Sequence, residues 1–260
     1  MTDGSQAMTG MAQQAERSDA AGEYSSPTLC VEWMGDTFEF HPEGGVWHRS
    51  SRTLFVADLH FGKAATFRSA GIPLPAGATD RTLDLLGQLV DRVRPRRLII
   101  LGDLVHARPG LQQSVIDAVT RWRAARSSLA IDLVMGNHDR RAGPMPPEWN
   151  METHEYLLID ERWRCVHDPA GANALHQDQG VLAGHLHPGI RIDCPDGGSR
   201  KFRCFHLQPR VMVLPAFGMF TGSALIRPAA PDRVIAAEIE RKTGARMLVE
   251  VTSLVIPRRT

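Results

Sequence analysis

The first half of the sequence alternates short apolar runs with segments of helical periodicity. The apolar runs are TLFVAD at residues 53–58, RLIILGD at 97–103 and LAIDLVMGNHD at 129–139, the last of which we expect to end in a loop. Between them, apolar residues recur at helical spacing over 79–93 and 114–126. The order strand–helix–strand–helix–strand predicts a parallel sheet with right-handed crossovers, and therefore an α/β fold.

The segments on either side of this region have a different pattern. LCVEWM and TFEFH predict a hairpin that turns at Gly35-Asp36, with GVWH returning after it. The second half contains EYLLID, WRCVHD, GVLAGH, FRCFHL and VMVLPAF, which are strand-like and have short polar connections. They predict a second, partly antiparallel sheet. The pattern leaves residues 233–239 open between strand and helix, and it does not place the apolar run at 247–256.

Composition limits the classes of function. The chain has 260 residues, of which 43% are hydrophobic, and its formal net charge is +1. This fits one globular domain, and the charge of the whole chain predicts no strong attraction to nucleic acid or an acidic membrane surface. Four cysteines without a CxxC pair argue against a zinc knuckle or a disulfide framework. With no signal peptide and no apolar run of membrane-spanning length, we expect a cytoplasmic protein without a membrane partner.

Polar side chains that can serve as metal ligands come directly after five of the apolar runs. They comprise two carboxylates, one amide and five imidazoles: Asp58, His60, Asp103, Asn137, His138, His167, His185 and His187. Because ligands of α/β sheets bind outside the carboxyl ends of the strands, we expect these side chains to converge at one edge. Buried without a function, such a set would leave polar groups unpaired and carboxylates repelling one another.

Metal ions would remove both difficulties. Asp, His and Asn without a thiolate suit manganese, iron or zinc better than a closed structural zinc site. The set is too large for one tetrahedral ion and about right for two divalent ions that share a bridging ligand. We expect two such ions, with manganese as the first choice and iron or zinc as alternatives.

The ordered motifs DLH, GDLVH, GNHD, a single His and GHLH resemble those of the calcineurin-like metallophosphoesterase superfamily. Three longer stretches, DLHFGKAATFRSAGIPLP, GDLVHAR and LPAFGMFTG, resemble the bacterial DNA ligase-associated metallophosphoesterases. That group is associated with a DNA ligase, a helicase and an exonuclease in the handling of DNA damage. The resemblance implies a four-layer α/β/β/α sandwich with two mixed β-sheets. We expect a disordered tail at 1–27, a catalytic domain at 28–227 and a partly ordered extension at 228–260.

The resemblance also implies a role for each matched residue. The first ion would be held by Asp58, His60 and His187, and the second by Asn137, His167 and His185. Asp103 would bridge the ions, a hydroxide between them would attack phosphorus, and His138 would stabilise the transition state or protonate the leaving group. Candidate substrate contacts are Arg140, Arg68 and Arg108. His106 stands where many phosphatases have an acidic residue, so it assists His138, contacts substrate or only packs.

The implied function is hydrolysis of phosphodiester bonds in nucleic acid or nucleotides. The sequence does not decide whether the substrate is DNA or RNA, and it does not predict the oligomeric state. A phosphomonoesterase or a cyclic-nucleotide phosphodiesterase is the alternative, and a non-catalytic scaffold is a weaker one. Within the site, His154 and His176 compete with His167 for its place.

Overall fold

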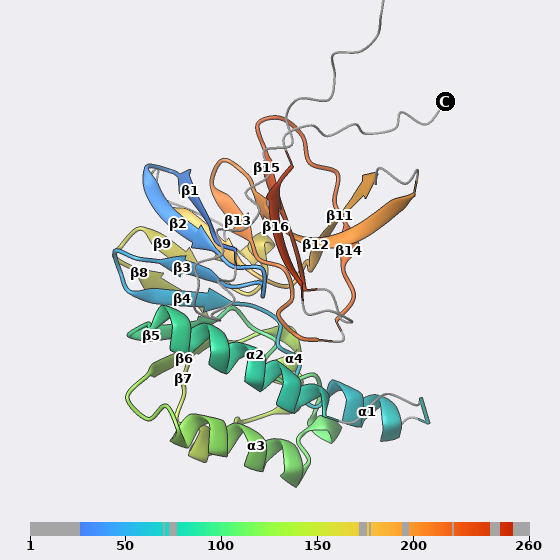
Figure 1. The fold of residues 1–260 in the computed structure, drawn as a ribbon. Coiled ribbons are helices and arrows are strands. Elements are labelled where there is room, and N and C mark those ends of the chain that lie inside the picture. Colours follow the sequence, from blue (N-terminus) through green and yellow to red (C-terminus); the bar gives the residue numbers. More distant parts are fainter. Residues whose placement is uncertain are drawn as a thin grey trace, which may run out of the picture.

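The computed structural model describes residues 27–69, 71–72, 77–171, 176, 178–193, 198–219, 221–239 and 245–251. Two β-sheets face each other, and two long helices lie on the outer side of the first sheet (Figure 1). Most of residues 1–27, which we expect to form a tail, lie outside the described residues.

The first sheet has seven strands in sequence order. They are β1 (Leu29–Trp33), β2 (Asp36–Phe40), β3 (Val46–His48), β4 (Thr53–Val56), β5 (Arg97–Ile100), β6 (Ala130–Val134) and β7 (Glu152–His154). Strands β1 to β4 pair antiparallel, which confirms the predicted hairpin and its returning strand. Strands β4 to β7 pair parallel, which confirms the sheet predicted from the alternating pattern.

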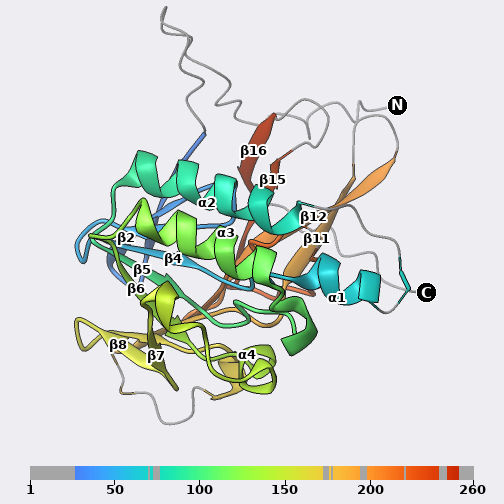
Figure 2. The same cartoon turned by 90° about the horizontal axis from the view of Figure 1, so that it is seen from below.

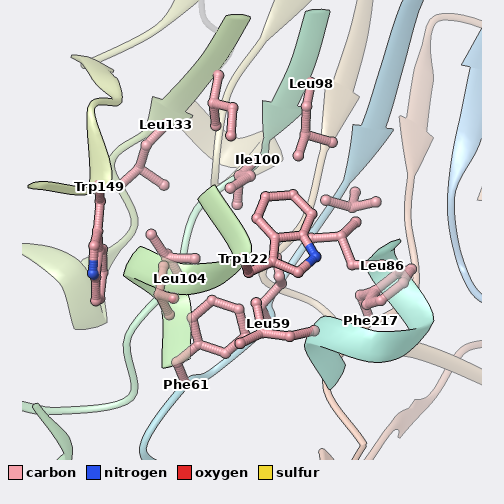
Figure 3. Close-up of a cluster of buried hydrophobic side chains, with 14 of the residues drawn as sticks. Leu59, Phe61, Leu86, Leu98, Ile100, Leu104, Trp122, Leu133, Trp149 and Phe217 are labelled. Carbon is pink, nitrogen blue, oxygen red and sulfur yellow. The ribbon is translucent and has the colours of Figure 1, made fainter. Parts of the chain in front are cut away.

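The two longer helices that connect these strands bury their apolar faces on the first sheet. The α-helices are α1 (Lys63–Ser69), α2 (Ala78–Val93), α3 (Gln113–Ala124) and α4 (Asn137–Ala142). Leu86 of α2 and Trp122 of α3 project toward Leu98 and Ile100 of β5 (Figure 3). Burying a side chain of the size of Leu86 contributes about 1.5–3 kcal/mol. Figure 2 shows α2 and α3 running side by side across the sheet.

The second sheet has nine strands. They are β8 (Leu157–Ile159), β9 (Trp163–Cys165), β10 (Gly180–Ala183), β11 (Pro188–Asp193), β12 (Ser199–Leu207), β13 (Val211–Val213), β14 (Ala224–Leu225), β15 (Arg233–Ile239) and β16 (Arg246–Glu250). Strand β10 runs parallel to its neighbours β9 and β13, whereas β12 is antiparallel to β11, β13 and β15. Both sheets are therefore mixed, which confirms the predicted fold class.

The two sheets pack through a shared aromatic core. Phe40 of the first sheet meets Phe205 of the second with ring centroids 4.9 Å apart, and Trp33 stacks on Trp163 at 5.4 Å. Cys165 is completely buried in this layer, as its apolar surroundings in the sequence suggest. Because the residues of this layer are buried and closely packed, the loops at one end of both sheets are held in fixed relative positions.

Two expectations about secondary structure are resolved by the structure. The expectation that the run at 129–139 ends in a loop is wrong in part, because Asn137 begins the helix α4. The segment Arg233–Ile239 is a strand that pairs with β12, and its partner β16 overlaps the start of the unplaced apolar run. The domain boundary at 227 stays a prediction. None of the described helices combines the length and the apolar character of a membrane span.

Candidate metal centre

The predicted polar residues follow five parallel strands from both sheets. Asp58 and His60 follow β4, Asp103 follows β5, and Asn137 and His138 follow β6 of the first sheet. His167 follows β9, and His185 and His187 follow β10 of the second sheet. The structure brings all eight of them together at one edge of the sandwich.

One group of these side chains surrounds His187. Its Nε2 lies 3.3 Å from His60 Nε2 and 3.5 Å from Asp58 Oδ1. Two ligand atoms about 2.1 Å from a common ion are roughly 3.0–3.4 Å apart at coordination angles of about 90–110°. The spacing of these three side chains therefore suits one ion.

A second group surrounds His167. Its Nδ1–H donates to Leu101 O at 3.1 Å, because a carbonyl can only accept, and this leaves a lone pair on Nε2. That Nε2 lies 3.0 Å from Asn137 Oδ1 and 3.0 Å from His185 Nδ1. Two acceptors, the amide oxygen and the imidazole lone pair, thus face each other, and a cation between them would turn a repulsion into an attraction.

Asp103 stands between the two groups. Its Oδ1 lies 3.4 Å from His167 Nε2, and its Oδ2 lies 4.0 Å from His60 Nε2. The carboxylate is held in place because the His138 backbone N–H donates to Oδ1 at 2.9 Å. A side chain at Gly136 would be impossible here, since its Cβ would lie 2.2 Å from Asp103 Oδ1.

The backbone at these residues is strained. Asp58, His60, Asp103, His185 and His187 have φ between 44° and 68°, in the left-handed region that residues other than glycine rarely adopt. They make up five of the eleven such residues in the described part of the chain. Each departure costs about 1–3 kcal/mol, and such strain gathers at functional sites.

Burial controls the charge of the first group. Asp58 is fully buried, and burial raises the pKa of its carboxyl. Its Oδ2 accepts the His185 backbone N–H at 2.9 Å, whereas Oδ1 has no hydrogen-bond donor among the described residues. Burial, with the nearby charges of His187 and Lys63, lowers the pKa of His60 to about 2. His60 is therefore neutral at pH 7 and able to coordinate a metal.

Comparison with known proteins agrees with this geometry. The sequence model of the calcineurin-like phosphoesterase family matches residues 51–213, more than half of the chain. The chain belongs to the calcineurin-like phosphoesterase family. This confirms the resemblance read from the motifs and identifies the chain as a metal-dependent phosphoesterase.

One solved structure supports the same assignment. The chain is similar to nuclease MPE of Pseudomonas putida, with 32% identity over 81% of this chain and 96% of that one and a TM-score of 0.68. Yfce, a phosphoesterase from E. coli, is 17% identical over 76% of this chain and 97% of its own, with a TM-score of 0.40. No curated protein sequence matches this chain significantly.

The residues of this phosphoesterase fit a divalent metal. The buried Asp58 Oδ1 lacks a donor, and Asn137 Oδ1 faces the lone pair of His167. Both arrangements are unfavourable by themselves and become favourable with a cation. All the candidate ligand atoms are oxygen or imidazole nitrogen, as manganese, iron and zinc accept.

His138 sits beside this centre with its ring fixed. Its Nδ1–H donates to His106 O at 2.5 Å, which turns Nε2 toward Asp103 Oδ2 at 3.9 Å. The His106 ring stacks on it with centroids 4.9 Å apart, and Phe67 packs near His106 at 5.7 Å. His106 therefore contacts His138 through both its ring and its backbone oxygen, and its role among the three alternatives stays a prediction.

The predicted arginines are less closely connected with the site. Arg140 forms an ion pair with Glu155 at 2.5 Å and donates to Met135 O at 3.1 Å. Arg108 Nη1 donates weakly to Ala142 O at 3.4 Å, and Arg68 lies exposed near the end of α1. Contact of these three with a substrate remains a prediction.

The competing histidines lie elsewhere. His154 Nε2 pairs with Asp132 Oδ1 at 2.7 Å, in a group where Arg97 already binds both carboxylate oxygens. His176 is exposed. Of these histidines, His167 is the one next to Asp103.

Asp139 is a contributor that the sequence did not single out. This fully buried residue accepts the Val105 backbone N–H at 2.9 Å and the Gly136 backbone N–H at 3.0 Å. It thereby ties the loop after β5 to the start of α4, which carry Asp103 and Asn137. The only sequence signal was its place in GNHD, directly after His138.

Proposed function

We propose that this chain hydrolyses phosphodiester bonds of nucleic acid with two divalent ions. The first ion would be held by Asp58, His60 and His187, the second by Asn137, His167 and His185, and Asp103 would contact both. The observation that carries this proposal is the position of Asp103, whose two carboxylate oxygens face one group each.

The ions, when bound, supply Lewis-acid chemistry that makes water nucleophilic near neutral pH and neutralises phosphate charge. The protein adds fixed groups around them. The hydrogen bond of His138 to the carbonyl of His106 keeps a proton on Nδ1, so Nε2 gives or takes a proton at the reaction centre. Its side chain is 31% exposed, so a substrate can reach it.

A diester of nucleic acid is supported by the nuclease from Pseudomonas putida, which is 32% identical to this chain. We further propose manganese as the metal, with iron or zinc as alternatives. Action in DNA repair, in the cytoplasm and alongside a DNA ligase, a helicase and an exonuclease, is part of the same proposal. It is supported by the stretches that resemble ligase-associated enzymes.

The test is a comparison of four substrates with and without Mn²⁺. They are a generic phosphodiester, a phosphomonoester, a 2′,3′-cyclic nucleotide and a DNA strand. We expect Mn²⁺-dependent hydrolysis of the generic diester and the DNA strand. A preference for the monoester or the cyclic nucleotide would overturn the nucleic-acid assignment, and no hydrolysis of any of them would favour the scaffold.

A further inference from the structure

A cavity of about 220 Å³ lies beside β12 and β15 of the second sheet. Its walls come from residues 201–203 of β12, residues 237–239 of β15 and the loop at 216–223. The cavity has room for about seven water molecules of about 30 Å³ each, or for one phosphate with its sugar. Lys201 and Gly222 of its wall are exposed, so it opens to solvent. None of the predicted metal ligands lines it, so a ligand here would leave the metal centre free.

Two cationic side chains of β12 point into this cavity. Side chains alternate between the two faces of a strand, and Phe205 and Leu207 belong to the core between the sheets. Lys201 and Arg203 therefore lie on that same face of β12, in the direction in which the apolar residues end. Arg203 Nη2 donates to Pro42 O at 2.7 Å, on the turn that follows β2 of the first sheet, which confirms the direction of its side chain.

Neither cation has a carboxylate partner in the described part of the chain. Arg203 is partly buried and donates only to backbone oxygens, of which Ala216 O lies at 3.3 Å. Burial lowers the pKa of Arg203 to about 10, so the guanidinium is still charged at pH 7. Lys201 donates to Ser223 O, which leaves two of its three N–H groups for a ligand. Glu238, the acidic residue of the described wall, forms no ion pair with either of them. Because a partly buried charge has lost hydration, an anion in the cavity would bind favourably.

The loop at 216–224 connects this cavity to the candidate metal centre. The backbone N–H groups of Gly218 and Ala224 donate to Asp58 O at 3.2 Å and to His187 O at 2.8 Å. Both acceptors belong to predicted ligands of the first ion. The cavity is therefore separated from that group of ligands by the thickness of one loop.

We propose that Lys201 and Arg203 bind a phosphate group of the nucleic-acid strand that lies a few nucleotides from the scissile one. Guanidinium and ammonium groups are the usual partners of phosphate oxygens. Arg203 pairs with Gly189, two residues beyond His187, so it lies roughly 7 Å along β11 and about 5 Å across from that ligand. Since the nucleotides of a stacked strand rise by about 3.4 Å each, a strand held at the metals reaches the cavity within a few nucleotides. This inference rests on the proposed function and adds a requirement for a substrate with several phosphates.

The first test removes the charge of Lys201. Lys201→Gln should raise KM for a DNA strand and leave hydrolysis of a diester with a single phosphate unchanged. In EDTA, which stops cleavage, binding of a fluorescent DNA strand should weaken, and the salt dependence of log Kd should lose about 0.7 of its slope, the share of one phosphate contact in a single strand. The matched control is Arg200→Gln, because Arg200 is the exposed neighbour whose side chain points to the other face of β12.

The second test removes the charge of Arg203. Arg203→Gln keeps an N–H donor for one of the backbone oxygens and should raise KM for the DNA strand in the same selective way. Arg123→Gln is its control, because Arg123 is also a buried arginine that donates to a backbone oxygen, but it belongs to α3. Urea unfolding of both variants identifies conditions in which both are folded, and the strand is compared there.

A third measurement distinguishes the strand from a free nucleotide, which carries the same phosphate chemistry. Binding of the DNA strand and of deoxythymidine monophosphate is measured for the parent protein and for Lys201→Gln. We expect the variant to bind the strand more weakly. If it instead loses affinity for the monophosphate alone, the cavity takes a free nucleotide and the strand assignment is wrong.

The outcomes separate this inference from the proposed function. If the parent protein cleaves the DNA strand and Lys201→Gln matches Arg200→Gln on both substrates and in the salt series, the phosphate site is wrong and the proposed function stands. Equal loss on the single-phosphate diester would also overturn the site, because Lys201 would then serve the scissile phosphate. If the parent protein cleaves no diester, the proposed function fails, and an unchanged salt slope of Lys201→Gln in EDTA would reject the phosphate site separately.

Discussion

Asp103 lies between the two groups of side chains that make up the candidate centre. Each of its oxygens faces a different group of histidines, and the His138 backbone N–H fixes its orientation. An amide in its place would present one oxygen and one N–H, so one side would meet a donor in place of an acceptor.

We therefore predict that Asp103→Asn lowers metal content at both positions. The loss should exceed the about 10–100-fold drop in affinity that follows when a residue that only orients a ligand is changed. Metal analysis after dialysis against Mn²⁺ measures it. The matched control is Asp91→Asn, because Asp91 is an exposed carboxylate paired with Arg126. Metal content equal to that of the parent protein would contradict the proposal that Asp103 contacts both ions.

His138 is expected to act on the reaction and not on the metal. His138→Ala should retain both ions and lower kcat by about 10²–10⁴-fold, the usual contribution of a general acid or base. Metal analysis and steady-state rates on the same sample separate the two effects. Full turnover in the variant would rule out the proposed role.

At the scale of single residues, the motifs predicted which side chains come together but not the backbone conformation of those residues. All eight predicted polar residues converge, since each follows a strand whose apolar run is plain in the sequence. The left-handed φ of Asp58, Asp103 and His185 has no sequence signal, because neither Asp nor His demands that conformation.

Helix α4 is the element that most directly shapes the site. It starts at Asn137, and the carboxylate of Asp139 in its first turn receives the Gly136 and Val105 backbone N–H groups. The sequence predicted a loop here, since six residues are too few to show helical periodicity. The longer helices α2 and α3 were predicted within a few residues, because several apolar side chains recur in each.

We predict that Asp139→Ala loosens this element. Two buried hydrogen bonds to a carboxylate would be lost, which should lower the free energy of unfolding by about 2–4 kcal/mol. Part of the effect is offset, because burial raises the pKa of this carboxyl and so makes its charged form less favourable. Urea unfolding measures the change, with the exposed Asp117→Ala as control. Equal stability of the two variants would contradict the proposal that Asp139 holds the loop after β5 to the start of α4.

At the scale of the molecule, the sequence predicted that there are two sheets but not the order of the strands in the second sheet. The alternating first half specifies its parallel sheet directly. The short strands of the second half carry no information on their order, and the face-to-face arrangement came from the resemblance to a family. Strand β15 could not be placed, because a seven-residue apolar segment fits a strand or a helix.

The position of β15 yields a prediction about the expected boundary at 227. Residues Val234–Ala237 of β15 are completely buried against β12 and the core. A chain that ends at Arg227 would lose this burial, roughly 5 kcal/mol or more, which is comparable to the whole stability of many domains. We expect no cooperative thermal unfolding from it, whereas a chain that ends at Val251 should unfold cooperatively. A cooperative transition in the shorter chain would support 28–227 as an independent unit.

Each proposed ion would take ligands from both sheets. Asp58 and His60 belong to the first sheet and their partner His187 to the second, while Asn137 joins His167 and His185 from the opposite sides. Each ion would then cross-link the two sheets, because its full set of ligands comes together only when the sheets are packed against each other. By thermodynamic linkage, every ion bound would resist the separation of the layers. Removal of the ions with a chelator would therefore stop the chemistry and also lower the free energy needed to separate the two sheets, which their aromatic core still holds together.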